Sequence, residues 1–155
     1  MSTAEVRGGT YGEVLEVRSD ADVLACHTLM QQLRPKLLTA EGWLLRFQRQ
    51  AADGYRLFAL WQDKRPVALA GFRLQENLVH GRFLYVDDLV TDSTDRSGGR
   101  GAWLMDALKA EASRCGCDLL VLDSGLANVR AHRFYYRNGL LAQALRFSMP
   151  VQDAQ

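Results

Sequence analysis

The spacing of apolar residues predicts a strand and two helices in the first third of the chain. Residues 13–18 alternate enough between apolar and polar side chains for a half-buried strand. Ser19 or Asp20 then offers an N-cap for a helix with apolar residues at helical spacing that ends at Pro35, and a second amphipathic helix runs from about Ala40 to Ala51. We expect residues 1–10, which are small and polar, to be poorly ordered.

The middle of the chain predicts a hairpin followed by a strand, a helix and a strand. Residues 55–61 and 67–74 have the composition of strands and are joined by a turn-forming connection. The next strand covers Phe83–Thr91, a helix covers Ala102–Cys115, and Asp118–Asp123 is a short, nearly all-apolar strand, typical of a sheet covered on both faces. Strand, glycine-rich turn, helix and buried strand together predict a βαβ unit.

The last part of the chain predicts one more helix and one more strand. Asn128 caps a helix that ends at Asn138, Gly139 holds the position that follows a helix, and a strand is expected near Gln143–Met149. These elements predict an α/β sandwich whose mixed sheet is mostly antiparallel on its N-terminal side. We expect residues 1–155 to form a single domain.

The turn after the strand 83–91 has the sequence Arg96-Ser97-Gly98-Gly99-Arg100-Gly101-Ala102. Backbone N–H groups at a helix N-terminus have no partner inside the helix and bind anions well, so this turn predicts a phosphate or pyrophosphate site. A P-loop would need Gly-Lys-Ser/Thr at its end, and a dinucleotide fingerprint would need a different glycine spacing. The pattern that fits is Arg-x-x-Gly-x-Gly/Ala, met by Arg96, Gly99 and Gly101.

A second motif lies downstream, at Asn128-Val-Arg-Ala131-His-Arg-Phe134-Tyr135-Tyr136-Arg-Asn-Gly139-Leu140. The two motifs, in this order and at this distance, resemble those of the GNAT superfamily of N-acetyltransferases over residues 55–149. Leu140 stands where the family usually has Phe, and Ser93 where a proline often precedes the turn. The resemblance implies an α/β, GNAT-like three-layer sandwich, in which a mixed central sheet of six to seven strands carries helices on both faces.

The resemblance also implies acetyl-CoA as cosubstrate, with no metal. The glycine turn would hold the pyrophosphate, and the end of the preceding strand would pair with the pantetheine arm, as a peptide adds to a sheet edge. A backbone N–H of Leu89 or Val90 would face the thioester carbonyl. For Arg133 a solvated basic helix face is the competing interpretation. The cofactor residues are Leu89, Val90, Thr91, Arg96, Ser97, Gly98, Gly99, Arg100, Gly101, Ala102, Asn128 and Arg133.

Two adjacent acids are candidates for handling the acceptor amine. Asp87 and Asp88 resemble the acidic pair of polyamine acetyltransferases, and a carboxylate there can attract and deprotonate an amine that arrives as a cation. Neighbouring strand side chains point to opposite faces unless a bulge intervenes, so only one of the two would reach the amine directly. The structural alternative is a pair with an arginine such as Arg73 or Arg82.

Tyr135 is the candidate acid for the leaving thiolate. It occupies the family's tyrosine position, whereas Tyr136 lies about 100° further around the helix. The resemblance also places the first two helices over the acceptor, so the corner at residues 33–38 would influence which amine is used. Direct transfer is favoured because none of the cysteines lies in the motif tract.

Composition and charge exclude several other classes. The chain is 48% apolar and 24% charged, as in ordinary globular domains, and its net charge of +1 is too small to attract nucleic acid or membrane. Three cysteines do not make a secreted disulfide framework, and Cys115-Gly116-Cys117 predicts a helix end flanked by two small buried thiols rather than a metal site. No signal pattern or long apolar run is present, so we expect a soluble, cytoplasmic protein.

The sequence therefore predicts an N-acetyltransferase that moves an acetyl group from acetyl-CoA directly to a primary amine of a small molecule or protein. The sequence does not decide whether the protein forms a homodimer. The fold also does not determine which amine is the acceptor. The alternative is a catalytically silent acyl-CoA-binding or sensing module. A third interpretation is an α/β interaction domain without a CoA site.

Overall fold

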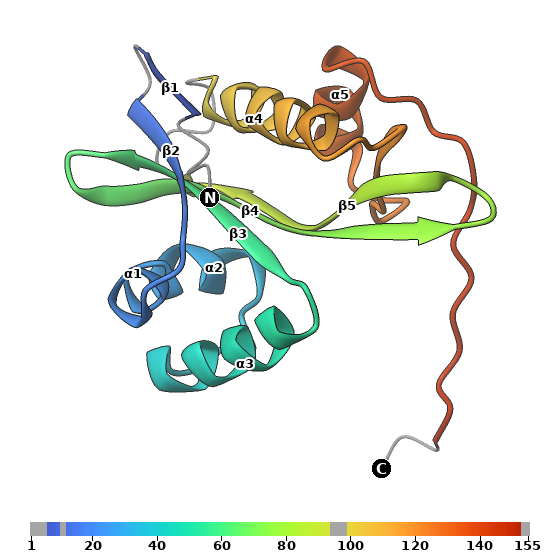
Figure 1. Cartoon of the computed structure of the whole chain (residues 1–155). Coiled ribbons are helices and arrows are strands. Elements are labelled where there is room, and N and C mark those ends of the chain that lie inside the picture. Colours follow the sequence, from blue (N-terminus) through green and yellow to red (C-terminus); the bar gives the residue numbers. More distant parts are fainter. Residues whose placement is uncertain (1–5, 10–11, 94–98, 153–155) are drawn as a thin grey trace. The chain divides into compact units, whose positions relative to one another are not determined.

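The computed structural model describes residues 6–9, 12–93 and 99–152, and the chain forms two compact units, Met1–Leu122 and Asp123–Gln155 (Figure 1). The first unit holds a mixed sheet in the order β1-β2-β3-β4-β5-β6. All neighbouring pairs are antiparallel except β5 and β6, which are parallel. The strands are β1 (Val6–Gly9), β2 (Gly12–Glu16), β3 (Arg56–Gln62), β4 (Arg65–Asn77), β5 (Gly81–Thr91) and β6 (Leu119–Leu122).

The helices of the first unit cover both faces of its sheet. Figure 1 shows α1 (Asp20–Ala25), α2 (His27–Leu33) and α3 (Ala40–Ala52) on one face and α4 (Arg100–Arg114) on the other. Leu57 and Ala59 of β3 belong to the core beneath α1–α3, and alternation along the strand turns the buried Phe58 and Leu60 to the α4 face. The predicted mixed α/β architecture with helices on both faces is therefore confirmed.

The described sheet does not reach the seven strands at the upper end of the prediction. Strands β2 to β6 form a five-stranded body, and β1 adds only a short, irregular pairing at the edge beside β2. Residues 6–9 were expected to be poorly ordered and instead form β1, while residues 1–5 and 10 lie outside the described part of the chain. The last predicted strand was expected at 143–149, where the described backbone is irregular.

The predicted helix from Asp20 to Pro35 is two helices. At Cys26 the backbone N–H bonds to the carbonyls of Val23 and Leu24, so the regular ladder tightens and is interrupted. Ser19 caps α1 as predicted, because its hydroxyl accepts a hydrogen bond from the Asp22 N–H at 3.2 Å. The second predicted helix, 40–51, is confirmed by α3.

Two burial predictions near α4 are wrong. The thiols of Cys115 and Cys117 are half-buried rather than buried, although Gly116 has the positive φ of +72° expected of a residue that ends a helix. Strand β6 pairs only with β5 among the described residues, and its Leu119 is 46% exposed. An apolar strand can therefore lie at the edge of the described sheet, where burial on both faces is incomplete.

The second unit contains α5 (Val129–Arg137), whose ends follow the sequence prediction. The Asn128 side chain accepts a hydrogen bond from the Ala131 N–H at 3.3 Å, and Gly139 follows the helix with φ +88°. Residues 140–150 are irregular, and Leu145, Phe147 and Met149 are exposed. The described part of this unit contains no strand with which they could pair, so apolar alternation alone does not make a strand there.

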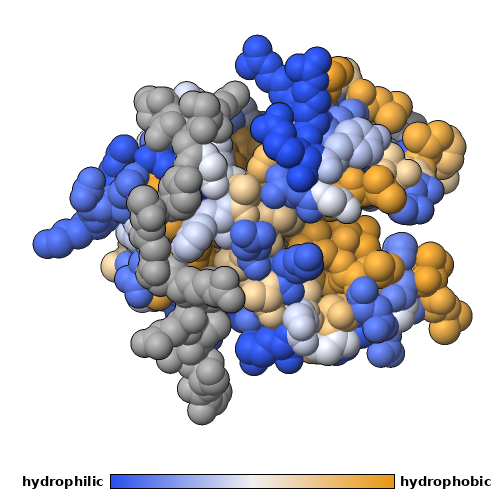
Figure 2. Space-filling view, turned by 90° about the horizontal axis from the view of Figure 1, so that it is seen from above, coloured by the Kyte–Doolittle hydropathy of each residue, from blue (hydrophilic) through white to orange (hydrophobic). Residues whose placement is uncertain are grey.

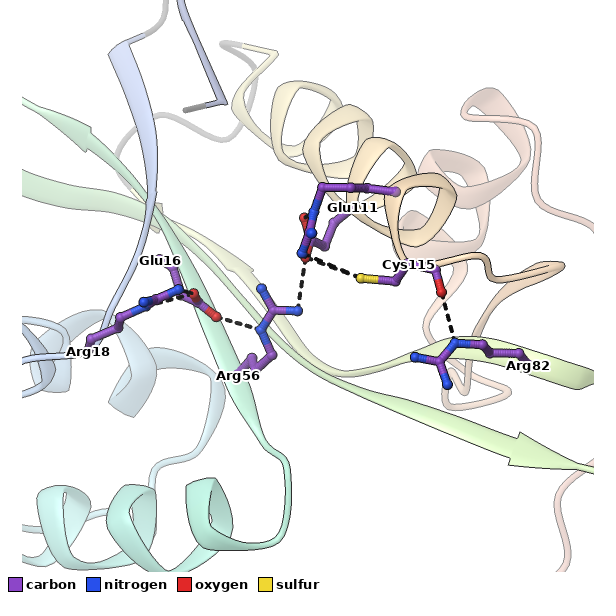
Figure 3. A network of polar contacts seen from close by, with 7 residues as sticks. Glu16, Arg18, Arg56, Arg82, Glu111 and Cys115 are labelled. Atoms are coloured by element: carbon purple, nitrogen blue, oxygen red, sulfur yellow. Dashed lines mark hydrogen bonds and ion pairs between the residues drawn. The ribbon is translucent and has the colours of Figure 1, made fainter. Parts of the chain in front are cut away.

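A chain of ion pairs links two strands to α4 in the first unit. Figure 3 shows Arg56 between Glu16 and Glu111, with Nε–Oε1 and Nη1–Oε1 distances of 2.5 and 2.9 Å. Arg18 forms a further ion pair with Glu16, and Arg114 forms a second ion pair with Glu111. The Glu111 side chain is only 2% exposed, and hydrogen bonds from Arg114 and then Arg56 lower its pKa to about 2, although burial opposes this shift.

Glu111→Gln is expected to destabilise the fold at neutral pH by about 2 kcal/mol, because it leaves Arg56 and Arg114 without the buried charge that holds them. The folded-state pKa lies below the ordinary value of 4.5, so the Glu111 contribution is present above that value and is lost as the pH falls toward 2. Unfolding free energies measured from pH 7 to pH 2 should fall more steeply for wild type than for the variant. The exposed Glu76→Gln serves as control and should leave that slope unchanged.

Hydrophobic side chains also remain on the surface. Figure 2 shows them beside strongly hydrophilic ones on the face seen from above. At the β4–β5 turn, Leu78 and Val79 are almost fully exposed. Mixed surfaces of this kind are normal for a folded protein, so the exposure alone identifies no binding site.

Candidate active site

The N-terminus of α4 begins at a glycine in the left-handed conformation. Gly99 caps the helix with φ +75° and ψ +6°, a backbone that favours glycine. Its carbonyl accepts a hydrogen bond from the Trp103 N–H at 3.0 Å, which closes the first turn. Arg96, Ser97 and Gly98, which also belong to the predicted anion site, lie outside the described residues.

The first turn of α4 offers backbone donors rather than the Arg100 side chain. Arg100 is buried, and its Nη2 donates a hydrogen bond to Gln62 Oε1 at 2.6 Å. The next residues, Gly101 and Ala102, are half-buried and carry no acid into the first turn. An anion at this terminus would therefore meet the N–H groups of residues 100–102 and the positive end of the helix dipole.

Strand β5 extends beyond its parallel neighbour. Phe83–Val86 pairs with Leu119–Leu122, and the ladder ends there. From Asp87 to Thr91, β5 continues beside β4 alone among the described residues. The Asp87 carbonyl accepts a hydrogen bond from Arg34, whereas from Leu89 to Thr91 no second described strand pairs with the other edge of β5. An extended ligand could add there, as in strand addition.

The three predicted cofactor residues of β5 differ in exposure. Val90 is 8% exposed and packs in the core beneath α1–α3. Leu89 and Thr91 are half-buried. For Val90 at least, the backbone rather than the side chain is the part that a pantetheine arm would use.

A β-bulge brings both acids of β5 to one face. Val86 pairs with Phe72 and Asp88 with Gly71, so Asp87 is an extra residue in the strand. The expectation of opposite faces held for a strand without a bulge, so it does not apply here. The hydrogen-bond partners of both carboxylates lie on the face of the sheet that α1–α3 cover.

Asp88 is held by a buried tyrosine and by the corner after α2. The Tyr55 hydroxyl donates to Asp88 Oδ2 at 2.8 Å, and Arg34 Nε donates to Oδ1 at 2.9 Å. Tyr55 is 3% exposed and packs edge-on against Phe47 of α3. A Cβ at Gly71 would lie 1.8 Å from the Tyr55 hydroxyl oxygen, so glycine at this position leaves the space that the tyrosine needs.

Asp87 is held by Arg73 of β4. Arg73 Nε and Nη2 donate to the two carboxylate oxygens at 2.9 and 2.8 Å, which is the bidentate geometry of a strong charge-assisted pair. Arg73 lies two residues after Gly71 on β4 and therefore shares the face of Tyr55. Of the two arginines considered as structural partners, Arg73 takes that role, whereas Arg82 donates to the Cys115 carbonyl at 2.8 Å.

Burial and the two acids keep Tyr55 protonated. Burial raises the pKa of the Tyr55 hydroxyl well above 10, and the negative charge of Asp88 adds to the effect. The hydrogen bond between Arg73 and Asp87 raises the pKa of the Arg73 guanidinium above its ordinary value. The cluster of Arg34, Tyr55, Arg73, Asp87 and Asp88 is thus a fixed arrangement of two cations and two anions.

The second unit contains the remaining predicted residues. Asn128 caps α5, and Arg133 is exposed on that helix. Tyr135 is half-buried, burial raises the pKa of its hydroxyl, and Tyr136 is 55% exposed. The hydroxyl of Tyr135 forms no hydrogen bond with another described residue.

Sequence reasoning missed the roles of Arg34 and Tyr55. Arg34 donates from Nε and Nη2 to Asp88 and to the Asp87 carbonyl, across a separation of more than 50 positions in the chain. The predicted acceptor-selecting corner at 33–38 contains Arg34, so the general place was indicated while the residue was not. Tyr55 was assigned only to a strand, because spacing does not show which aromatic residue carries a hydrogen-bonded hydroxyl.

The described residues contain neither a cluster suited to a metal ion nor a helix suited to span a membrane. No group of three or more His, Cys, Asp and Glu side chains is placed to hold a metal ion. No helix among the described segments is long and apolar enough to cross a membrane.

These features define an α/β fold with a mixed sheet covered by helices on both faces, and comparison with known proteins identifies its family. Residues 24–140 match the model of the acetyltransferase (GNAT) family. The chain is 33% identical over 127 residues to the uncharacterized N-acetyltransferase YhdJ of Bacillus subtilis strain 168, covering 81% of this chain and 89% of that protein. The chain belongs to the GNAT acetyltransferase family and is an enzyme of this class.

Solved structures agree on the fold. An aminoglycoside N-acetyltransferase, AAC(6')-Iy in complex with CoA, superposes with a TM-score of 0.79 at 16% identity, over 95% of this chain and 99% of that one. A ribosomal-protein-alanine N-acetyltransferase from Brucella melitensis biovar Abortus 2308 gives a TM-score of 0.77 at 16% identity, over 89% and 99% of the two chains. At these identities the likeness concerns the fold, and the acceptors named there belong to those proteins.

Proposed function

We propose that this protein transfers the acetyl group of acetyl-CoA directly to a primary amine of a small molecule or a protein. The observation that supports this most is the β5 bulge, where both Asp87 and Asp88 lie on the face of α1–α3. The bulge comes just before the end of the strand, which pairs with β4 alone among the described residues. An amine approaching that face would lie next to the strand end at which we propose that the thioester binds. Family membership supports the reaction type.

The described residues fit CoA at two points. The left-handed Gly99 and the backbone N–H groups at the start of α4 suit a pyrophosphate. The edge of β5 from Leu89 to Thr91, which pairs with no second strand among the described residues, suits the amides of the pantetheine arm. When bound, acetyl-CoA supplies the acetyl group as a thioester. Arg96, Ser97 and Gly98 complete the proposed pyrophosphate site from outside the described residues, and Asn128 and Arg133 remain proposed contacts from α5.

Asp87 and Asp88 are the proposed acids on the acceptor side. Each is engaged by an arginine, so an incoming ammonium group would share or replace a guanidinium at the carboxylate before it loses its proton. Tyr135 is the proposed acid for the CoA thiolate. Burial raises the pKa of its hydroxyl, so the hydroxyl is protonated at neutral pH and can act as a donor to the sulfur as negative charge develops there.

Thiol release tests the proposed function. Purified full-length protein is mixed with acetyl-CoA and with panels of primary amines, and free CoA is measured as thiol. The proposal expects amine-dependent release well above the hydrolysis of acetyl-CoA by the protein alone. CoA binding in a titration, without release for any amine in the panels, would favour a silent binding module instead.

Replacement of each acid should weaken acceptor use selectively. Asp88→Asn removes the charge that holds Arg34, and Asp87→Asn removes the charge that holds Arg73. We expect each variant to lower kcat/KM for the amine by about 10- to 100-fold, the scale of one positioned acid or charge pair, while the Kd of acetyl-CoA stays near wild type. Steady-state kinetics with both substrates varied provide the measurement. If the variants lose kcat/KM equally for the amine and for acetyl-CoA, the two acids have only a structural role.

The cellular location is also part of the proposal. We place the protein in the cytoplasm, and we leave a homodimer open. Fractionation of cells that express the tagged chain tests the first point, and sedimentation of the purified protein tests the second.

A further inference from the structure

Arginines, rather than acids, form the exposed part of the cluster on β5. The Asp88 and Asp87 side chains are 15% and 23% exposed, whereas those of Arg34 and Arg73 are 52% and 40% exposed. The carboxylates are thus the inner members of each pair and the guanidinium groups the outer ones. An acceptor that enters from solvent meets positive charge first.

Each guanidinium is held in place and still has donors to spare. Arg34 uses Nε and Nη2 for Asp88 and the Asp87 carbonyl, and Arg73 uses Nε and Nη2 for the Asp87 carboxylate. The Nη1 group of neither arginine bonds to another residue within the described ranges. Because a guanidinium carries five N–H donors in a rigid plane, an arginine fixed on one edge can present the other edge to an anion.

The two arginines come from different elements and converge on the same bulge. Arg34 lies at the end of α2, in the corner expected to influence acceptor choice, and Arg73 lies on β4. The buried Tyr55 fixes Asp88, and so indirectly the orientation of Arg34. This supports a preformed site in which neither guanidinium has to be ordered when a ligand binds, which lowers the entropic cost of binding.

We infer that the acceptor carries an acidic group, a carboxylate or a phosphate, beside its primary amine, and that Arg34 and Arg73 bind that group. The inference rests on the proposed acetyl transfer and narrows its substrate class. The cluster has no net charge, so it offers little attraction to a polyamine, whereas a zwitterionic acceptor finds both signs of charge.

Matched pairs of acceptors test the inference in the full-length protein. Alanine and 1-aminoethylphosphonate carry an acidic group, alaninamide has the same amine without it, and spermidine is a polycation. We expect wild type to prefer the acidic acceptors over alaninamide by at least about tenfold in kcat/KM, the scale of one charge-assisted hydrogen bond. The alanine and phosphonate arms separate a carboxylate from a phosphate as the group recognised.

Variants of the two arginines provide the second arm. Arg34→Gln and Arg73→Gln should each reduce the preference for the acidic acceptor by about tenfold, without changing the KM of acetyl-CoA. Lysine at either position keeps the charge but not the planar fork, so Arg34→Lys and Arg73→Lys should recover part of the preference. Arg18→Gln, which removes a 62% exposed arginine paired with Glu16, is the matched control and should leave the preference intact.

Calorimetric titration keeps the test independent of turnover. The acceptors are titrated into protein saturated with CoA, and the acidic member of each pair should bind more tightly to wild type than to the glutamine variants. If this holds while no amine is acetylated, the proposed function fails and the inference stands. Tighter binding of alaninamide or spermidine by wild type, or an unchanged preference in both glutamine variants, would overturn the inference.

Discussion

Gly99→Val is expected to abolish CoA binding while the protein remains folded. Gly99 caps α4 with φ +75°, a conformation that β-branched residues rarely adopt, and in our proposal its backbone lies against the pyrophosphate. Valine would strain the cap and place a branched side chain where the backbone must approach the ligand. We expect the Kd of CoA in a titration to rise by at least about 100-fold, because several anion-binding N–H groups are displaced together.

A glycine at the other end of the same helix separates backbone strain from ligand contact. Gly116 follows α4 with φ +72°, and a Cβ built there has no atom within 4 Å. Gly116→Val should therefore cost comparable backbone strain, seen as a similar loss in Tm, with the CoA affinity unchanged. A folded Gly99→Val protein that binds CoA as tightly as wild type would refute the pyrophosphate assignment.

Much of the fold could be predicted because its signals are local. The hairpin of β3 and β4, helix α3 and the Asn128 and Gly139 ends of α5 each depend on residues close together in the chain. The family could be recognised for the same reason, since the glycine turn and the Asn128 motif are short and contiguous. Propensity, capping and turn chemistry act over a few residues, so a single sequence contains them.

The charge arrangement of the candidate site could not be predicted, because it depends on contacts between distant segments. The bulge at Asp87 is defined by the register against β4, and register involves residues on another strand. Arg34, the partner of Asp88 in the corner after α2, lies 54 positions earlier in the chain. Two acids in a row therefore suggested a site for cations, while the folded structure presents arginines as the outer groups.

The expected strand at 143–149 is wrong for a related reason. Its apolar alternation is a property of the segment alone, whereas a strand also needs a neighbour for its backbone groups. The helix break at Cys26 is a similar case, since residues 20–33 have continuous helical spacing and the interruption lies in backbone hydrogen bonds. Patterns of apolar residues thus do not by themselves show where a strand pairs or where a helix breaks.

Tyr135→Phe is expected to lower kcat by about 100-fold, the usual scale for one positioned acid, while the fold and the Kd of CoA are preserved. Tyr135 is half-buried, and burial raises the pKa of its hydroxyl, so the group keeps its proton at neutral pH and can give it to the CoA thiolate. Phenylalanine fills the same space without the proton. Single-turnover and steady-state measurements at saturating substrates separate the chemical step from binding.

Tyr136 is the matched control on the same helix. It is 55% exposed and lies about 100° further around the helix axis, so Tyr136→Phe should change kcat by less than about twofold. A catalytic tyrosine also predicts that the slow step of Tyr135→Phe depends on how good a leaving group the thiolate is, because a more acidic thiol needs less protonation. Acetyl thioesters of thiols with lower pKa should recover part of the lost rate in that variant. Equal, near wild-type kcat in both phenylalanine variants would show that the thiolate leaves without help from Tyr135.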